Sequence, residues 1–339
     1  MTIDVASFAA RIPKAELHVH LEGTISPQAY LRIARRNGIE PKDADEIFKC
    51  HDFPSFLMAF LEVVKALRTP YDFAELAKEY LDRSTGEHVR HVEFFLSPAT
   101  QRKFVPDLDP KEMIDAVWDA CEKAQTEHGI SSRLIIDMVR NLGEEEALRD
   151  VDLASECASS GVVGIGLGGD ERKFPARGFQ RAFARARAEK LRRTVHAGEA
   201  SGPDSIVDAV ELLYAERIGH GVAASGRPEV LALLRDRNVT IDACPTSNIF
   251  TAALEKGEAH PLREFLDAGV AVTLSSDDPS FFKSSVNAEY RYAAALGCGV
   301  EEITAIAKAS FDRSFLPASD RQRLVGEVDA YIDGFGITR

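Results

Sequence analysis

The sequence predicts an α/β fold, a (β/α)8 TIM barrel, and three observations support this prediction. The chain has 339 residues, which is longer than most domains but ordinary for one barrel. Short runs of apolar and β-branched residues alternate with segments of helical periodicity, as they do in βα units. Ionisable side chains lie at the carboxyl ends of several of these runs, and the carboxyl ends of barrel strands are where such folds carry functional groups. We therefore expect a single domain over residues 1–339.

The eight strands of this barrel can be assigned to runs of apolar and β-branched residues. The runs cover residues 15–20, 91–97, 132–139, 162–167, 193–196, 217–220, 239–243 and 270–274. Eight parallel strands close a barrel whose inner face is filled by side chains.

The longest gap between neighbouring strands covers about residues 24–90. It contains two amphipathic stretches, 55–67 and 72–82, which predict extra helices inserted after the first strand. Because βα loops lie on the functional face of a barrel, this insertion could cover the site as a lid. The alternative is that it only thickens the outer wall.

Composition and short motifs exclude several kinds of partner. The net charge of −13 and the absence of a long basic cluster argue against nucleic acid, which would require a positively charged surface. The first residues lack the pattern of a secretory signal, and the strongest apolar stretch, 56–61, is too short to span a bilayer. We expect a cytoplasmic protein without a membrane partner, and assembly into a homo-oligomer is compatible with the sequence.

The cysteines are expected to be reduced and structural. They are odd in number, widely spaced and never arranged as CxxC, which disfavours both a disulfide framework and a cysteine metal site. A catalytic thiol at Cys244 is the alternative. The five cysteines are Cys50, Cys121, Cys157, Cys244 and Cys298.

A set of histidines and aspartates at predicted strand ends indicates a metal site. In the HVH motif, the period of two along a strand turns both imidazoles to the same face. Three histidines and one aspartate suit a borderline divalent ion such as zinc, which lowers the pKa of water enough to supply hydroxide near neutral pH. The alternative, a buried polar network without a metal, would leave many ionisable groups unpaired. The residues concerned are His18, His20, His196, His220, Asp277 and Asp278.

The end of the fourth strand favours one metal over two. A binuclear site needs a bridging carboxylate or a modified lysine there, but residues 166–171 read GLGGDE, with glycines at the bridging position. These glycines would allow the backbone to approach a flat ligand closely. A phosphate-binding loop is the alternative, but it lacks a following GK[ST] and is supported only by Lys173 just beyond the run.

Six motifs together resemble one known family. PKAELHVHLEG, LGGDE, HAGE, RIGHG, CPTSN and SSDDP occur in the order and at the spacing of the adenosine and adenine deaminase family of the amidohydrolase superfamily. The resemblance covers nearly the whole chain. It implies a hydrolase that uses one divalent metal, most often Zn²⁺, and no organic cofactor to remove the 6-amino group of a small-molecule adenine-type purine.

The resemblance also implies a role for each residue of the site. His18, His20, His196 and Asp277 would bind the metal. Glu199 would protonate purine N1, because attack at C6 pushes electron density onto that nitrogen. The alternative for Glu199 is a surface carboxylate at the start of a helix.

The remaining roles concern the attacking water and the edges of the purine. His220 would orient the water and accept its proton. Asp278 would hydrogen-bond N7, and the backbone N–H of Gly169 would meet N3. Glu22 would contact the substrate where adenosine-specific members resemble HLDG, with an aspartate that helps to hold the ribose.

The motifs leave the exact substrate open. HLEG, LRTPYDF and HVEFF resemble the adenine deaminase branch, RIGHG resembles the adenosine branch, and CPTSN points to 6-aminodeoxyfutalosine. We expect an adenosine-like nucleoside, with adenine and 6-aminodeoxyfutalosine as alternatives. More remote alternatives are a mononuclear cyclic amidohydrolase and a purine sensor without turnover.

Overall fold

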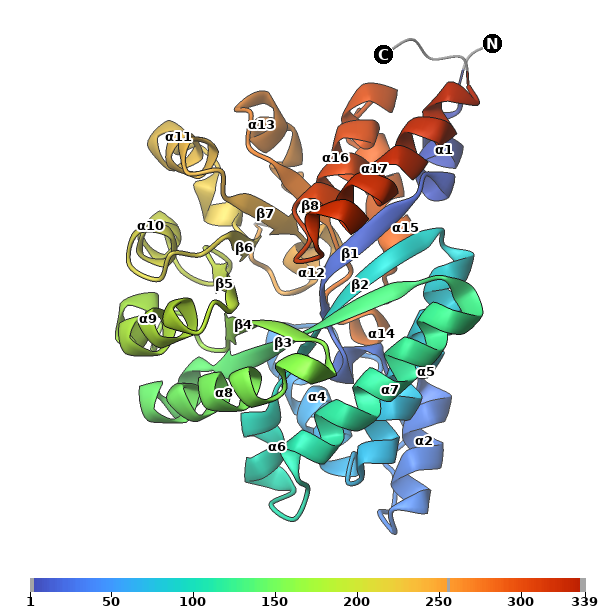
Figure 1. Ribbon diagram of the computed structural model, residues 1–339, viewed down its shortest axis with the longest axis vertical. Coiled ribbons are helices and arrows are strands. Elements are labelled where there is room, and N and C mark those ends of the chain that lie inside the picture. Colours follow the sequence, from blue (N-terminus) through green and yellow to red (C-terminus); the bar gives the residue numbers. More distant parts are fainter. Residues whose placement is uncertain (1–2, 255–256, 336–339) are drawn as a thin grey trace.

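A computed structural model describes residues 3–254 and 257–335, so the ends of the expected 1–339 domain lie outside the described residues. Within them, eight parallel strands follow one another in chain order around a barrel, with helices on the outside (Figure 1). The predicted fold is confirmed, and each predicted strand overlaps an observed one. The strands are β1 (Lys14–His20), β2 (Val89–Leu96), β3 (Ser131–Val139), β4 (Val162–Gly168), β5 (Arg192–Ala197), β6 (Arg217–His220), β7 (Thr240–Ala243) and β8 (Val272–Leu274).

The barrel closes between β1 and the segment that follows β8. Val19 forms a parallel bridge with Asp277. The backbone N–H of His20 donates to the carbonyl of Asp277 at 3.0 Å, and the N–H of Asp277 donates to the carbonyl of His18 at 3.2 Å. These bonds bring the first histidine motif and the aspartate pair side by side.

Helices surround the strands. Prolines and side-chain caps start many of them, because a helix leaves its first N–H groups without partners. The α-helices are α1 (Val5–Arg11), α2 (Pro27–Arg36), α3 (Ala44–Ile47), α4 (Phe53–Ala66), α5 (Pro70–Gly86), α6 (Pro98–Phe104), α7 (Pro110–His128), α8 (Glu144–Glu156), α9 (Gln180–Ala188), α10 (Pro203–Glu211), α11 (Pro228–Asp236), α12 (Pro245–Phe250), α13 (Leu262–Asp267), α14 (Pro279–Phe282), α15 (Val286–Ala295), α16 (Val300–Asp312) and α17 (Ala318–Asp333). Short 3-10 helices are η1 (Glu22–Thr24), η2 (Arg140–Leu142), η3 (Ala158–Ser160), η4 (Ala176–Phe179) and η5 (Val222–Ala224).

The expected extra helices after the first strand are present. Between β1 and β2 lie η1 and α2 to α5, and the two amphipathic stretches fall in α4 and α5. Each of these two helices begins with a capping box, at Asp52 and at Thr69, which satisfies the free N–H groups of the first turn. The amphipathic periodicity explains why these helices could be predicted, and the caps explain where each of them begins.

An aromatic cluster ties the insertion to the loop after β8. The ring of Phe56 in α4 lies 5.4 Å from that of Phe281 and 4.8 Å from that of Phe282. Both partners belong to α14, which starts directly after Asp278. The insertion therefore packs against the helix that directly follows the aspartate pair, and its action as a lid stays a prediction.

Two further expectations can be compared with the structure. All five cysteines are free, as expected. Burial raises the pKa of Cys244 well above its usual value, which is opposite to the lowered pKa of a reactive thiolate. Among the described helices, none combines the length and the apolar character needed to cross a membrane.

Candidate active site

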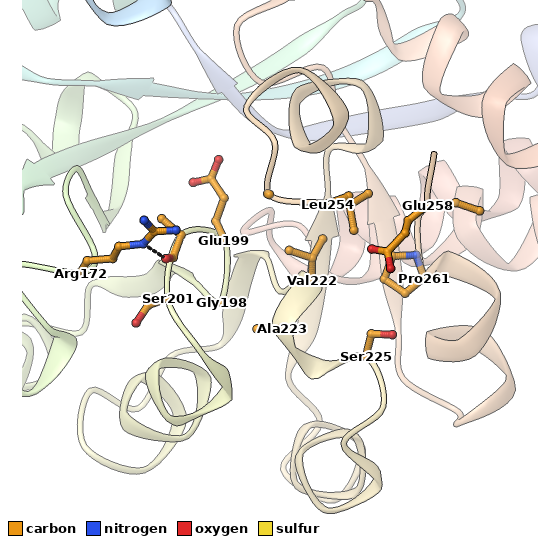
Figure 2. Close-up of a pocket in the computed structure, with 13 residues that line it drawn as sticks. Arg172, Gly198, Glu199, Ser201, Val222, Ala223, Ser225, Leu254, Glu258 and Pro261 are labelled. Carbon is orange, nitrogen blue, oxygen red and sulfur yellow. Dashed lines mark hydrogen bonds between the residues drawn. The ribbon is translucent and has the colours of Figure 1, made fainter. Parts of the chain in front are cut away.

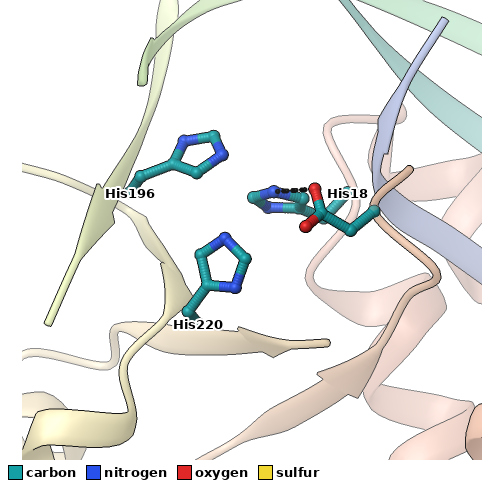
Figure 3. A group of neighbouring side chains, drawn as sticks. His18, His196 and His220 are labelled. Carbon is teal, nitrogen blue, oxygen red and sulfur yellow. Dashed lines mark ion pairs between the residues drawn. The ribbon is translucent and has the colours of Figure 1, made fainter. Parts of the chain in front are cut away.

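Four buried side chains from distant parts of the chain converge at the carboxyl end of the barrel. His18 comes from β1, His196 from β5 and His220 from β6, and Figure 3 shows their rings facing one another. Together with Asp277 they offer ligand atoms that all lie within 4.8 Å of one another. This spacing lets one ion contact several of them at once.

His20, the remaining histidine that is predicted to bind the metal, lies close to the same cluster. Nε2 of His20 is 3.4 Å from Oδ1 of Asp277 and 3.3 Å from Nε2 of His196. Nε2 of His18 lies 3.5 Å from the same Asp277 oxygen. The three histidines that the sequence predicts as metal ligands therefore meet around Asp277, the fourth predicted ligand.

Burial favours the uncharged form of three of these histidines, His18, His20 and His196. It lowers the pKa of His18 to about 3 and lowers that of His20 as well. Burial and the neighbouring imidazoles lower the pKa of His196 further. Burial alone would oppose ionisation of Asp277, but the adjacent imidazoles outweigh it and hold its pKa below the usual range. Neutral imidazoles and an ionised carboxylate are the forms that bind a metal.

The residues also fit a metal sterically. Both ring nitrogens of His18 are buried without a hydrogen-bond partner among the described residues, a condition that a bound metal would relieve. Two glycines leave the room that the site needs. A Cβ at Gly219 would lie 2.6 Å from Cε1 of His18, and a Cβ at Gly23 would lie 1.9 Å from Oδ1 of Asp278.

Two members of the cluster have strained backbones. His220 has φ 68° and Asp277 has φ 65°, the left-handed region that disfavours residues with a Cβ. Such a conformation costs on the order of 1–3 kcal/mol and is concentrated at functional sites. His220 is the last residue of β6, and Asp277 follows the end of β8, so the backbone turns at both positions where the strand ends.

Glu199 lies beside this cluster, in the loop after β5. Its Oε2 is 3.6 Å from Nε2 of His220, and burial raises its pKa. The loop is held by the buried carboxylate of Glu171, which the sequence prediction missed although it belongs to the GGDE run. Glu171 accepts four backbone N–H bonds, from Gly198 at 2.6 Å, Glu199 at 3.2 Å, Ala200 at 2.8 Å and Ser201 at 3.0 Å.

A cavity of about 550 Å³ opens along this loop (Figure 2). It runs from Arg172 and Glu199 on one side to Leu254 and Glu258 on the other, with Val222 between them. Its volume is within the range of small-molecule sites. The structure thus provides room for a ligand directly beside the predicted proton donor.

Two residues of the CPTSN motif support the cluster, although no role was predicted for them. Ser247 Oγ donates a hydrogen bond to Oδ2 of Asp277 at 2.6 Å. The side-chain amide of Asn248 lies 3.0 Å from Nδ1 of His220. A polar motif directly after a strand was the available signal, but its partners could not be read from the sequence.

The three residues predicted to contact substrate lie around the same end of the barrel. Asp278 is buried next to Asp277, and burial and that neighbour raise its pKa well above the usual value. Burial raises the pKa of Glu22 in η1 to about 7, and its Oε1 accepts the N–H of Ser97 at 3.4 Å. Gly169 follows β4 with φ 98°, a conformation that glycine adopts without strain.

Comparison with known proteins identifies the family. The family model described as adenosine deaminase matches residues 13–331. The chain belongs to the adenosine deaminase family. The predicted membership is therefore confirmed, and with it the class of enzyme: a hydrolase of C–N bonds in cyclic amidines, within the amidohydrolase superfamily.

Relatives with different names are equally similar to this family member. It is 37% identical to the aminodeoxyfutalosine deaminase of Streptomyces avermitilis, covering 97% of this chain and 93% of that protein. It is also 37% identical to the adenine deaminase of Cupriavidus necator, covering 98% and 96%. A solved amidohydrolase from Burkholderia ambifaria, which contains bound zinc, has a TM-score of 0.90 at 26% identity and covers 99% of this chain and 96% of that one.

Proposed function

We propose that the protein is a zinc-dependent hydrolytic deaminase of 6-aminopurines. The observation that carries this proposal is the position of Glu199, whose Oε2 lies 3.6 Å from Nε2 of His220 at the edge of the His and Asp cluster. This arrangement combines an acid with a raised pKa, a neighbouring base and a set of metal ligands. Amide or ester hydrolysis would not need an acid aimed at a ring nitrogen.

In this proposal His18, His20, His196 and Asp277 hold the metal. The zinc-bound relative supports the choice of ion, and so do the nitrogen and oxygen donors. When bound, the metal lowers the pKa of water and so supplies the nucleophile near neutral pH.

The other residues of the chain move protons and fix the ring. His220 orients the attacking water and accepts its proton. The side-chain amide of Asn248 contacts Nδ1 of this imidazole and fixes its orientation. Glu199, which burial keeps protonated at higher pH than an exposed carboxyl, donates to N1 as C6 becomes tetrahedral. Asp278 contacts N7 and the backbone N–H of Gly169 contacts N3, and these two contacts recognise the edges of the purine. Ammonia then leaves and a 6-oxopurine remains.

For the substrate we propose a 6-aminopurine nucleoside, adenosine-like, with adenine and 6-aminodeoxyfutalosine as further candidates. Support for a polar substituent comes from the buried side chains of Glu22 and Gln101, which interact with each other and place polar groups at this end of the barrel. The named relatives favour the two other candidates equally. A cytoplasmic location, a homo-oligomer and a single domain over residues 1–339 remain predictions from the sequence.

The test is a steady-state comparison of adenosine, deoxyadenosine, adenine and 6-aminodeoxyfutalosine with zinc-loaded protein. Loss of the adenine absorbance band and release of ammonia are measured together. We expect turnover of at least one compound, and the ratio of kcat/KM values assigns the substrate. Hydrolysis of a cyclic amide without ammonia from any purine would refute deamination. Stoichiometric purine binding without product would identify a sensor.

A further inference from the structure

Asp137 is a buried carboxylate at the end of β3 that the proposed reaction does not use. It is 4% exposed and follows three buried apolar residues, Leu134, Ile135 and Ile136. Its Oδ2 lies 3.9 Å from Nδ1 of His20, and within the part of the chain that the structure describes its Oδ1 has no hydrogen-bond partner. A carboxylate in such a strand is costly to bury unless it interacts with something specific.

The neighbouring strand leaves room for this carboxylate. A Cβ at Gly166 would lie 2.8 Å from Oδ1 of Asp137, and a Cβ at Gly168 would lie 3.0 Å from Oδ2. Both glycines belong to β4, which pairs with β3 so that Asp137 lies opposite Gly166. These glycines stand where a binuclear site would need a bridging carboxylate on β4, and they leave room for a carboxylate from β3.

The two nitrogens of His20 face different partners. Nε2 faces the cluster, at 3.4 Å from Oδ1 of Asp277 and 3.3 Å from Nε2 of His196, while Nδ1 faces Asp137. The ring also stacks on Phe95, with centroids 5.1 Å apart and planes at 26°. A histidine that binds a metal through one nitrogen commonly donates the N–H of the other to a carboxylate, which fixes its tautomer and orientation.

We propose that Asp137 is a positioning residue that holds the Nδ1–H of His20, so that the lone pair of Nε2 points at the metal centre. Ser97 contacts the same carboxylate oxygen, because its Oγ donates to Oδ2 of Asp137 at 3.4 Å. The inference rests on the proposed function only through the assignment of His20 as a metal ligand. It does not depend on which purine is the substrate.

The test measures zinc affinity in the isosteric variant Asp137→Asn by competition with a chelator, and zinc content by elemental analysis. We expect the zinc dissociation constant to rise about 10- to 100-fold, as for other outer carboxylates of metal sites, while circular dichroism shows a retained fold. The matched control is Asp72→Asn, which removes a buried carboxylate of the inserted helix α5 that pairs with Arg36. This control lowers thermal stability and leaves zinc affinity unchanged.

A double-mutant cycle shows whether Asp137 acts through His20. In a His20→Ala background, Asp137→Asn should weaken zinc binding no further, because coupled residues are non-additive. Wild-type zinc affinity in Asp137→Asn overturns the proposal. If the KM for purine also rises while zinc affinity is unchanged, Asp137 contacts the substrate instead of His20. If Asp137→Asn does not fold, Ser97→Ala replaces it. We expect this variant to lose a few-fold in zinc affinity, and an unchanged zinc affinity would count against the proposal. Zinc affinity remains measurable even if no purine is deaminated, so the two proposals fail separately.

Discussion

The side-chain amide of Asn248 lies 3.0 Å from Nδ1 of His220, and both residues are buried. This contact leaves Nε2 of His220 facing Glu199 and keeps the imidazole from rotating. A base that must accept a proton from water needs such an orientation as much as it needs a suitable pKa.

Replacing Asn248 by alanine should therefore lower kcat by about 10- to 100-fold, with little change in zinc content. Steady-state kinetics on the best purine and elemental analysis give both values. Asn37→Ala is a matched control, since Asn37 bonds Asp72 in the inserted helices. Equal kcat in the Asn248 variant and the wild type would remove Asn248 from the machinery that supports His220.

The strands and the proposed ligands could be predicted because both have local signals. Apolar runs mark strands, and His18, His196 and Asp277 stand where such runs end. The supporting residues have no local signal of this kind. Asp137 interacts with His20 across two strand pairings, β1 with β2 and β2 with β3, and only the closed barrel brings the two together.

Glu171 illustrates the same limit. It stands in a recognisable motif, but its function comes from four N–H groups of the loop after β5. The substrate could not be predicted for a related reason. Glu22 differs by only one methylene from the aspartate that stands in the HLDG motif of adenosine-specific members. Its partners, among them the N–H of Ser97, become visible only in the folded chain.

Glu199→Gln should retain zinc and lose about 100- to 10,000-fold in kcat, because an amide cannot supply the proton that N1 requires. Ammonia release under saturating substrate measures the loss. Glu229→Gln, an exposed carboxylate in α11, should behave as the wild type. Near-normal turnover in Glu199→Gln would mean that N1 is protonated by another group.

Gly219→Ala should weaken zinc binding by at least about tenfold. The added Cβ would lie 2.6 Å from Cε1 and 3.0 Å from Nδ1 of His18, and overpacking of a filled interior costs about 1–3 kcal/mol. Chelator competition and thermal unfolding report both effects. Gly326→Ala in α17, where a Cβ meets nothing within 4 Å, should leave zinc affinity unchanged. An unaltered dissociation constant in Gly219→Ala would show that His18 can move without loss.

Glu16 should make the stability of the metal-free protein depend on pH. Burial raises its pKa from 4.5 to about 7, although Ser276 donates to Oε1 from its N–H at 2.9 Å and its Oγ at 2.6 Å. Because the folded state holds this proton more tightly than the unfolded state, the stabilisation is complete below about pH 4.5 and is lost as the pH rises through about 7.

Compared with Glu16→Gln, the wild type should therefore lose about 3 kcal/mol of unfolding free energy over this pH range. Urea unfolding of both proteins in the presence of a chelator, followed by circular dichroism at several pH values, measures the difference. Parallel pH dependence of the two proteins would mean that Glu16 titrates alike in the folded and unfolded chains.

The bridge between Val19 and Asp277 also constrains when this protein can become functional during its synthesis. His18 leaves the ribosome early, whereas the carboxylate that faces it is added only when most of the chain has been made. A nascent chain that ends before residue 277 carries every proposed histidine ligand but cannot close the ring that orients them. Zinc should therefore bind late in the synthesis of the polypeptide, and its binding would show that the first and last strands have come together.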